Sequence, residues 1–278
     1  MGIGRSLAAP YLREAMAPER WGAGAMRAQS GGSAMNPRDG LRDEAYFTSF
    51  VAKTEQSISH AKEGLLREGA DGRRGYLARY NIAREELTVI FARYSRGDAI
   101  DSIGNSFSAF LDDWLSAPVS DSCVDVIRVC SLASLLGTGR SGATLIEQHV
   151  RSSDGASWDW LFGFILGLES APPDRAPSAW KMYRPLTDVV YADGRESRQR
   201  AMKRYLRYWY QRHQCCWWWG YDKKTDVDLY FGYWAVEAAA VARRLGMDDA
   251  PLRKSRYYPY DLAHFLDGRE GRGAAGAR

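Results

Sequence analysis

Apolar residues recur every three or four positions along most of the chain, and this spacing constrains the fold more than any other feature. On an α-helix, residues with this spacing lie on one face, which a globular protein buries. Three stretches show the pattern, at 47–65, 76–94 and 100–114, and a fourth follows at 126–136. Alternation with a period of two, which marks a half-buried strand, is not reliable anywhere. The sequence therefore predicts an all-α protein, a multi-helix bundle.

Interruptions of the helical period divide the predicted bundle into two helical halves. A soft boundary lies near Arg151–Gly155, and the Pro-rich segment Ala171–Pro177 predicts a long surface loop. We expect an N-terminal helical domain at 41–152 and a C-terminal helical domain at 153–266. Residues 1–40 and 267–278 are predicted to be a disordered extension and tail. Residues 1–34 are either a mobile extension or upstream sequence before a start at Met35.

The second half contains further predicted helices, at about 178–192, 195–213 and 227–245. The helix at 195–213 carries apolar and basic side chains on opposite sides. Its apolar side holds Met202, Tyr205, Leu206, Trp209 and Tyr210, and its basic side holds Arg200, Lys203, Arg204 and Arg207. In the first half, we expect Asp98 to cap the helix that starts near Ile100, because an Asp side chain accepts hydrogen bonds from the free N–H groups of a first turn.

The charge balance argues against a dedicated nucleic-acid-binding domain. The formal net charge is +4, but residues 36–266 hold 31 basic and 30 acidic residues, a net of +1. A strongly basic domain is therefore not indicated. No stretch approaches 18 apolar residues without a charge, so we expect no membrane span.

Cysteine usage and the N-terminal sequence predict the compartment. The four cysteines, Cys123, Cys130, Cys215 and Cys216, show no C-x-x-C spacing, so we expect buried thiols in a reducing environment. No apolar segment of a secretory signal lies between Arg5 and Arg13. The expected location is the cytoplasm.

Motifs of catalysis and cofactor binding are weak. Gly137–Gly142 matches G-x-G-x-x-G, but the run before it has a helical period and no Lys follows, so a helix-to-helix turn is favoured over a nucleotide site. The four histidines, His60, His149, His213 and His264, lack the spacing of metal ligands. We therefore predict no metal, no cofactor and no catalytic residue, with a nucleotide-dependent enzyme as the least favoured alternative.

The basic side of the predicted helix at 195–212 has three interpretations. It is a solvated face, a protein interface to which Arg200 and Arg204 contribute, or a nucleic-acid site in which interleaved aromatic residues stack on bases. The aromatic residues lie on the opposite stripe from most of the charges, which favours a helix that buries one face.

The loop at 220–228 is the second candidate for partner binding. It carries Tyr221, Asp222, Asp226 and Asp228 between aromatic clusters at 217–219 and 230–234. Carboxylates on a loop held by aromatic residues suit a basic protein partner. The alternative is a solvated connection in which Asp226 or Asp228 caps the next helix. Because neither Asp222 nor Asp226 lies in an apolar stripe, we expect the fold to tolerate their replacement.

Glu237 lies among apolar residues in the run 233–241. An isolated buried charge is too costly, so we expect the carboxylate to be paired with an arginine or hydrogen-bonded. The ion pair is the favoured prediction.

Residues 228–241, 245–249 and 257–262 resemble the signature of the PoNi immunity family, and 41–47 resembles the start of the domain that usually precedes it. The resemblance spans about residues 41–266. It implies an all-helical immunity protein that binds and neutralises a PoNe-type DNase toxin, commonly delivered through the type VI secretion system. The mostly aromatic and small signature residues are expected to hold the fold, which leaves recognition to exposed loops.

The resulting hypothesis is a stoichiometric inhibitor that covers the active site of a cognate DNase toxin and catalyses nothing itself. It predicts a protein partner, no specific nucleic acid and no membrane. The rival hypothesis is an α-helical nucleic-acid-binding protein that uses the helix at 195–212.

Overall fold

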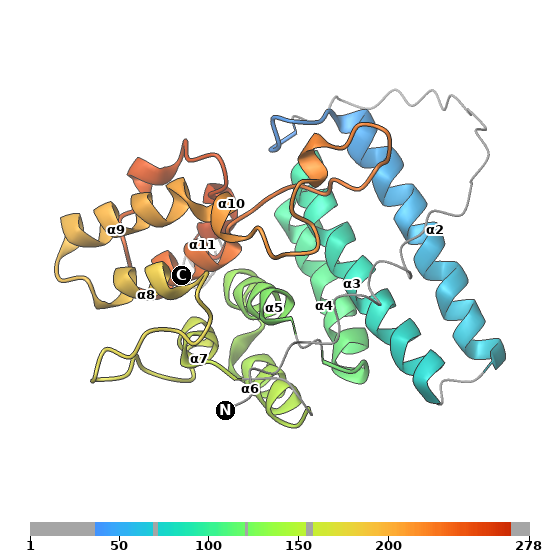
Figure 1. Cartoon of the computed structure of the whole chain (residues 1–278), viewed down its shortest axis with the longest axis horizontal. Helices are drawn as coiled ribbons and strands as arrows, with labels where there is room; N and C mark the ends of the chain where they lie inside the picture. Colours follow the sequence, from blue (N-terminus) through green and yellow to red (C-terminus); the bar gives the residue numbers. More distant parts are fainter. Residues whose placement is uncertain (1–36, 69–71, 120–121, 154–157, 268–278) are drawn as a thin grey trace, which may run out of the picture. The chain divides into compact units, whose positions relative to one another are not determined.

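The structure, a computed structural model, describes residues 37–68, 72–119, 122–153 and 158–267. Within these ranges the regular elements are all helices, as the periodicity predicts (Figure 1). None of these helices is long and apolar enough to cross a membrane. The predicted extension and tail lie outside the described residues, except for 37–40 and Asp267. Of these, Arg38 bonds to Asp261 at 2.5 Å, and Asp39 accepts a hydrogen bond from Tyr230 at 2.6 Å.

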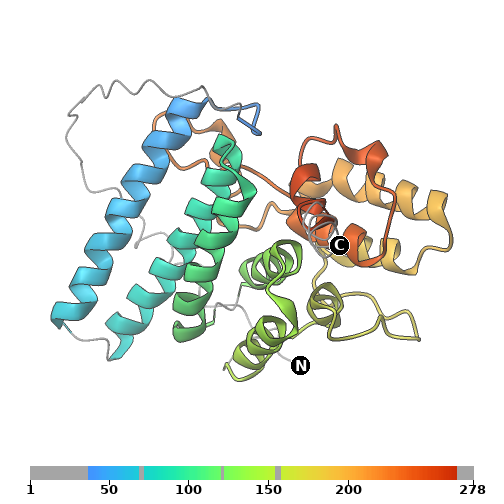
Figure 2. The ribbon, with the colours of Figure 1, turned by 180° about the vertical axis from the view of Figure 1, so that it is seen from behind.

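The first part of the chain forms a layer of three antiparallel helices, α2 (Glu44–Glu68), α3 (Gly72–Arg96) and α4 (Ile100–Ser116). Helix α3 packs against α2 on one side and α4 on the other (Figures 1 and 2). Most residues of the three predicted stripes are buried at these contacts, because the helical period brings them to one face. They include Phe47, Phe50, Ile58, Leu87, Ile90, Phe91, Ile103, Phe107 and Trp114. Tyr76, also assigned to a stripe, is 47% exposed.

The predicted cap of α4 is wrong. The N-cap residue is Ala99, whose side chain makes no capping bond. The carboxylate of Asp98 instead accepts two hydrogen bonds of 2.7 Å from Arg96, which neutralise it at the end of the preceding helix. Bidentate pairing with a guanidinium is the stronger interaction, so it takes the carboxylate away from the helix start.

Helix α5 (Cys123–Leu136) is central, and all but one of its residues are buried. It packs against α6 (Gly139–Arg151), α7 (Trp160–Leu166) and α11 (Val236–Arg244), so the packed core continues across residues 152 and 153. Gly137, at φ 79°, ends α5, and α6 begins two residues later. The G-x-G-x-x-G run is therefore a helix-to-helix turn, as favoured from the sequence.

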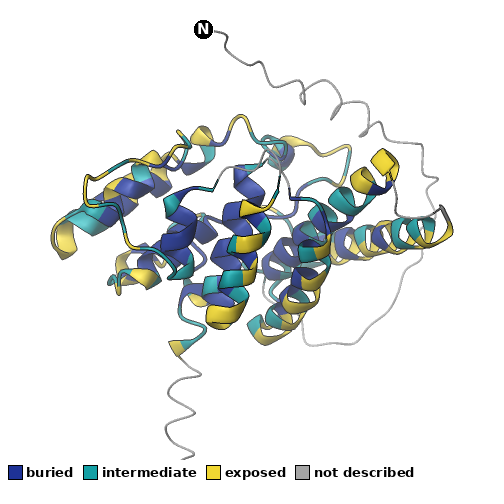
Figure 3. Cartoon of the chain, turned by 90° about the horizontal axis from the view of Figure 1, so that it is seen from below, coloured by how far each residue is buried: buried dark blue, intermediate teal, exposed yellow. Residues whose placement is uncertain are grey.

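The remaining elements are α8 (Arg184–Tyr191), α9 (Arg195–Arg207), α10 (Trp209–Arg212), the 3₁₀ turn η1 (Tyr221–Lys223), η2 (Ala250–Leu252) and α12 (Tyr260–Ala263). Across the described helices, buried residues lie mostly on the sides that face the middle of the molecule, and exposed residues on the outer sides (Figure 3). Cys123 and Cys130 are buried as expected, but Cys215 is exposed and Cys216 is half-buried, so the prediction of buried thiols holds only for the first two.

Three predicted helix boundaries are wrong in the second half. Helix α8 starts at Arg184 rather than 178, and the helix at 195–213 is divided at Tyr208. The Ala-rich helix starts at Val236 rather than 227, and residues 224–235 contain no regular element. The aromatic side chains of this segment are drawn into the core: the Tyr230 ring lies 6.2 Å from Phe47 of α2. Tertiary packing therefore overrides local helix propensity.

Candidate partner-binding surfaces

The buried frame behind the candidate surfaces is built around Glu237 on α11. Its carboxylate is 2% exposed and accepts hydrogen bonds from the Tyr205 hydroxyl at 2.7 Å and the Trp209 indole N–H at 2.5 Å. Burial raises the pKa of Glu237, and these hydrogen bonds oppose the rise. No cation among the described residues lies within ion-pair distance, so hydrogen bonds replace the favoured ion pair and fasten α9 and α10 to α11.

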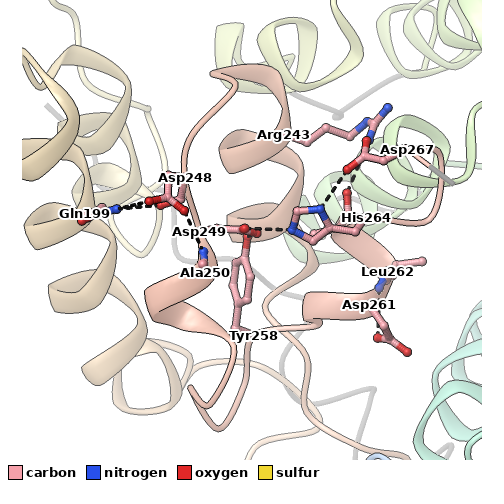
Figure 4. Close-up of polar contacts among 11 residues, drawn as sticks. Gln199, Arg243, Asp248, Asp249, Ala250, Tyr258, Asp261, Leu262, His264 and Asp267 are labelled. Carbon is pink, nitrogen blue, oxygen red and sulfur yellow. Dashed lines mark hydrogen bonds and ion pairs between the residues drawn. The ribbon is translucent and has the colours of Figure 1, made fainter. Parts of the chain in front are cut away.

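A second polar cluster fastens the C-terminal signature segments to each other (Figure 4). The buried carboxylate of Asp249 bonds to the Tyr258 hydroxyl at 2.5 Å and to Nε2 of His264 at 2.8 Å, while Nδ1 of His264 contacts Asp267 at 2.8 Å. Burial lowers the pKa of His264, but the two carboxylates outweigh it and raise the pKa above its usual value. Asp248, the residue before Asp249, binds Gln199 and Arg195 of α9. Asp248 and Asp249 of the signature are thus structural.

The loop at 220–228 is held on several sides. Tyr221 is 8% exposed, so its side chain belongs to the core. The half-buried carboxylate of Asp222 accepts a hydrogen bond of 2.6 Å from the Tyr210 hydroxyl, and its backbone N–H donates to Tyr233 at 3.2 Å. Arg42 donates to the backbone carbonyl of Asp222 at 3.1 Å. Because Asp222 has this internal role, the expectation that the fold tolerates its replacement applies only to Asp226.

The other two acids of the loop point to solvent. Asp226 is exposed and forms no ion pair with a described residue. Asp228 pairs with Lys53 of α2 at 2.7 Å, and both side chains are more than 40% exposed. Neither acid caps the next helix, because α11 begins eight residues after Asp228 and its N-cap is Ala235. The capping alternative is therefore wrong, and Asp226 is the free carboxylate of the loop.

The two arginines proposed from the sequence lie on the outer side of α9. Arg200 is paired with Glu196 at 3.3 Å, and Arg204 with Asp188 of α8 at 3.4 Å. Their side chains are 70% and 62% exposed. On the opposite side of the helix, Met202 and Tyr205 are fully buried, as the amphipathic pattern predicts. These arginines are accessible to a partner, but each already has an acidic neighbour.

Comparison with known proteins gives two consecutive family matches. The N-terminal model of the PoNe immunity protein (PoNi) matches residues 38–146, and the C-terminal model of the PoNe immunity proteins matches residues 158–262. The chain belongs to the PoNi family. The first PoNi match ends within α6 and the second begins just before α7; the second contains Glu237, Asp249 and the loop at 220–228. This confirms the resemblance inferred from the signature residues.

Among solved structures, the chain is similar to that of protein PA2201 from Pseudomonas aeruginosa. The two share 19% sequence identity with a TM-score of 0.62, over 86% of this chain and 93% of the other. At this identity the likeness concerns the fold alone. No curated protein matches the chain in sequence.

Proposed function

We propose that the chain is an immunity protein that neutralises a cognate DNase toxin of the PoNe type, delivered through a type VI secretion system. The proposal is supported by the two PoNi matches, which follow each other across residues 38–262. The protein acts in the cytoplasm, where the toxin meets DNA. It binds the toxin stoichiometrically, occludes the toxin's active site and catalyses nothing itself.

The loop at 220–228 supplies the acidic part of the proposed interface. Clefts of nucleases carry cations that hold phosphates, so an inhibitor gains by offering carboxylates there. Asp226 offers one without an internal partner, and Asp228 shares its charge with Lys53. Tyr221 and Asp222 contribute indirectly, because their internal contacts keep the loop ordered and reduce the entropy lost on binding. Arg200 and Arg204 contribute at the rim, where charge pairs add modestly.

The proposed function is tested with the purified toxin in a DNA-cleavage assay. Increasing amounts of the protein should suppress cleavage linearly and completely at one protein per toxin. Cleavage that persists with excess protein, when both proteins are folded, would contradict neutralisation by direct binding.

The role of the loop is tested by Asp226→Lys, with Asp112→Lys as a matched control on the exposed side of α4. We expect Asp226→Lys to weaken toxin binding by about 2 kcal/mol, the lower range for a desolvated charge partner. The control should leave affinity unchanged, and isothermal titration calorimetry measures both. Equal affinities for the two folded variants would place the acidic contact elsewhere.

The rival function, nucleic-acid binding through 195–212, is supported by the exposure of Arg200 and Arg204. Fluorescence anisotropy with a labelled DNA duplex at physiological salt distinguishes it from immunity. Under the proposed immunity function, affinity for DNA is weak and is abolished by moderate salt. Tight binding at physiological salt that Arg200→Glu with Arg204→Glu removes would favour the rival.

A further inference from the structure

A polar groove of about 480 Å³ runs between helices α9–α10 and the segment 255–257. Three cations line it: Lys203 and Arg207 from α9, and Arg256 from the opposite wall. Tyr257 and Leu206 add an apolar part to the lining. Lys203, Arg207 and Arg256 are exposed, so the groove is open to solvent.

None of these three cations forms an ion pair with a described acidic residue, and in this they differ from their neighbours. Three other arginines of α9 have acidic partners: Arg195 has Asp248, Arg200 has Glu196, and Arg204 has Asp188. The groove therefore holds three cations that are not neutralised by an acidic side chain of the described residues.

The groove is arranged to receive an anion. Lys203 and Arg207 are four residues apart on one helix, where like charges lie side by side and destabilise each other. A carboxylate between them would remove this repulsion. Across the groove, the Arg256 guanidinium lies 5.3 Å from the centre of the Tyr257 ring, which favours one orientation of a long side chain. A planar guanidinium binds a carboxylate with two hydrogen bonds.

The groove is connected to the loop at 220–228 through tyrosines. The Tyr257 ring stacks on that of Tyr210 with centroids 6.2 Å apart, and Tyr210 donates to the carboxylate of Asp222. Arg256 and Tyr257 also line a second pocket, of about 160 Å³, together with Tyr233, whose hydroxyl contacts the backbone of Asp222. A protein that covers the loop would therefore reach the groove across this cluster.

We propose that the groove binds an acidic segment of the toxin while the acidic loop faces the toxin's basic cleft. This inference rests on the proposed immunity function and adds a second, oppositely charged contact to it. A protein segment suits the groove better than a nucleic acid, because a phosphate backbone needs a continuous track of cations. Three of the four other arginines of α9 are already paired with acids, which interrupts such a track along the helix.

The test is charge reversal by Lys203→Glu with Arg256→Glu. On α9 the new glutamate precedes Arg207 by four residues, so it forms a favourable pair with that cation and neutralises it without weakening the helix. The matched control, Arg140→Glu with Lys181→Glu, reverses the same two residue types at exposed positions away from the groove. A milder variant, Lys203→Gln with Arg256→Gln, removes the charges without reversing them.

Calorimetric titration of each variant with the toxin should show about a 100-fold loss of affinity for the reversed variant. We expect a smaller loss for the glutamine variant and less than about a threefold change for the control. Circular dichroism checks that each variant is folded. If the reversed variant does not fold, the glutamine variant decides the matter.

The outcomes separate this inference from the proposed function. If the wild-type protein binds the toxin and the folded groove variant binds it equally well, the groove proposal is overturned and immunity stands. If the wild-type protein does not bind the toxin, the proposed function fails and the groove proposal with it. A labelled hexaglutamate peptide should bind the wild-type protein and lose binding in the groove variant. A DNA duplex that binds the groove more tightly than this peptide would also overturn the proposal.

Discussion

Replacing Gly232 with alanine, which adds a single methyl group, should strongly destabilise the fold. Gly232 lies in the signature run at φ +97°, in the left-handed region that disfavours residues with a side chain. A Cβ atom here would overlap the Ser95 hydroxyl and lie 2.9 Å from the indole nitrogen of Trp234. Ser95 is fully buried; its hydroxyl accepts a hydrogen bond from Trp234 at 2.8 Å and donates to a backbone carbonyl of α3. Gly232→Ala would therefore disrupt a buried polar network between α3 and the signature segment.

The loss of stability caused by Gly232→Ala is estimated by comparison with a matched control, Gly194→Ala. Gly194, at φ +79°, has no atom within 4 Å of an added Cβ, so Gly194→Ala adds only the strain of a backbone conformation that favours glycine, about 1–3 kcal/mol. At Gly232 the same cost is joined by overpacking, about 1–3 kcal/mol, and by a broken buried hydrogen bond, about 1–3 kcal/mol. We expect Gly232→Ala to lower the free energy of unfolding by at least about 3 kcal/mol, the sum of the three lower limits and a large part of the stability of an ordinary domain.

Urea unfolding followed by tryptophan fluorescence measures both changes. A double variant with Ser95→Ala supplies the coupling, because it removes the hydroxyl that an added methyl group would overlap. We expect the double variant to be more stable than the sum of the single changes predicts. The reasoning is refuted if Gly232→Ala and Gly194→Ala cost the same, or if the effects of Gly232→Ala and Ser95→Ala simply add.

Two further predictions concern buried titratable groups. Glu237→Ala should lower the free energy of unfolding by about 3–5 kcal/mol, because Tyr205 and Trp209 lose their hydrogen-bond acceptor. Glu237→Gln keeps an acceptor oxygen and should cost about 1 kcal/mol. Equal costs of the two variants in urea unfolding would contradict this prediction. Burial lowers the pKa of His213 from 6.5 to about 4, so the neutral ring stabilises the fold above pH 6.5, and this contribution is lost as the pH falls toward 4. Unfolding measured across this range should show the loss in the wild-type protein and a flatter profile in His213→Gln.

Local periodicity predicted the helices of the first half because their contacts repeat the spacing of the sequence. The burial of Phe47, Leu87 and Phe107 follows from that spacing alone. The segment 224–235 could not be predicted in this way, since its aromatic residues are as compatible with a helix as with an extended chain. Packing decides: Tyr230 inserts beside Phe47 of α2, and the left-handed Gly232 interrupts any helix.

Part of the candidate site could also be predicted from the sequence, and part could not. That Asp226 is exposed on a loop could be read from the sequence, and so could the basic side of α9. The groove could not, because Arg256 is 49 residues from Arg207 along the chain and meets it only in the folded protein. Nor does the sequence tell which cations are free, since the acids that neutralise Arg204 and Arg195 come from other parts of the chain.

Burial of the signature residues limits where toxin recognition can vary within this fold. Every residue from Tyr230 to Ala242 is buried, and Asp249 is used internally, so this central part of the family signature is not exposed to a toxin. The proposed contacts, Asp226 and the three groove cations, lie at exposed positions and form no ion pair with a described residue. Their replacement changes the charge offered to a partner at little cost to stability, because surface substitutions away from such networks are nearly neutral. One scaffold can therefore serve toxins of different surface charge, with its specificity set at positions that the fold does not constrain.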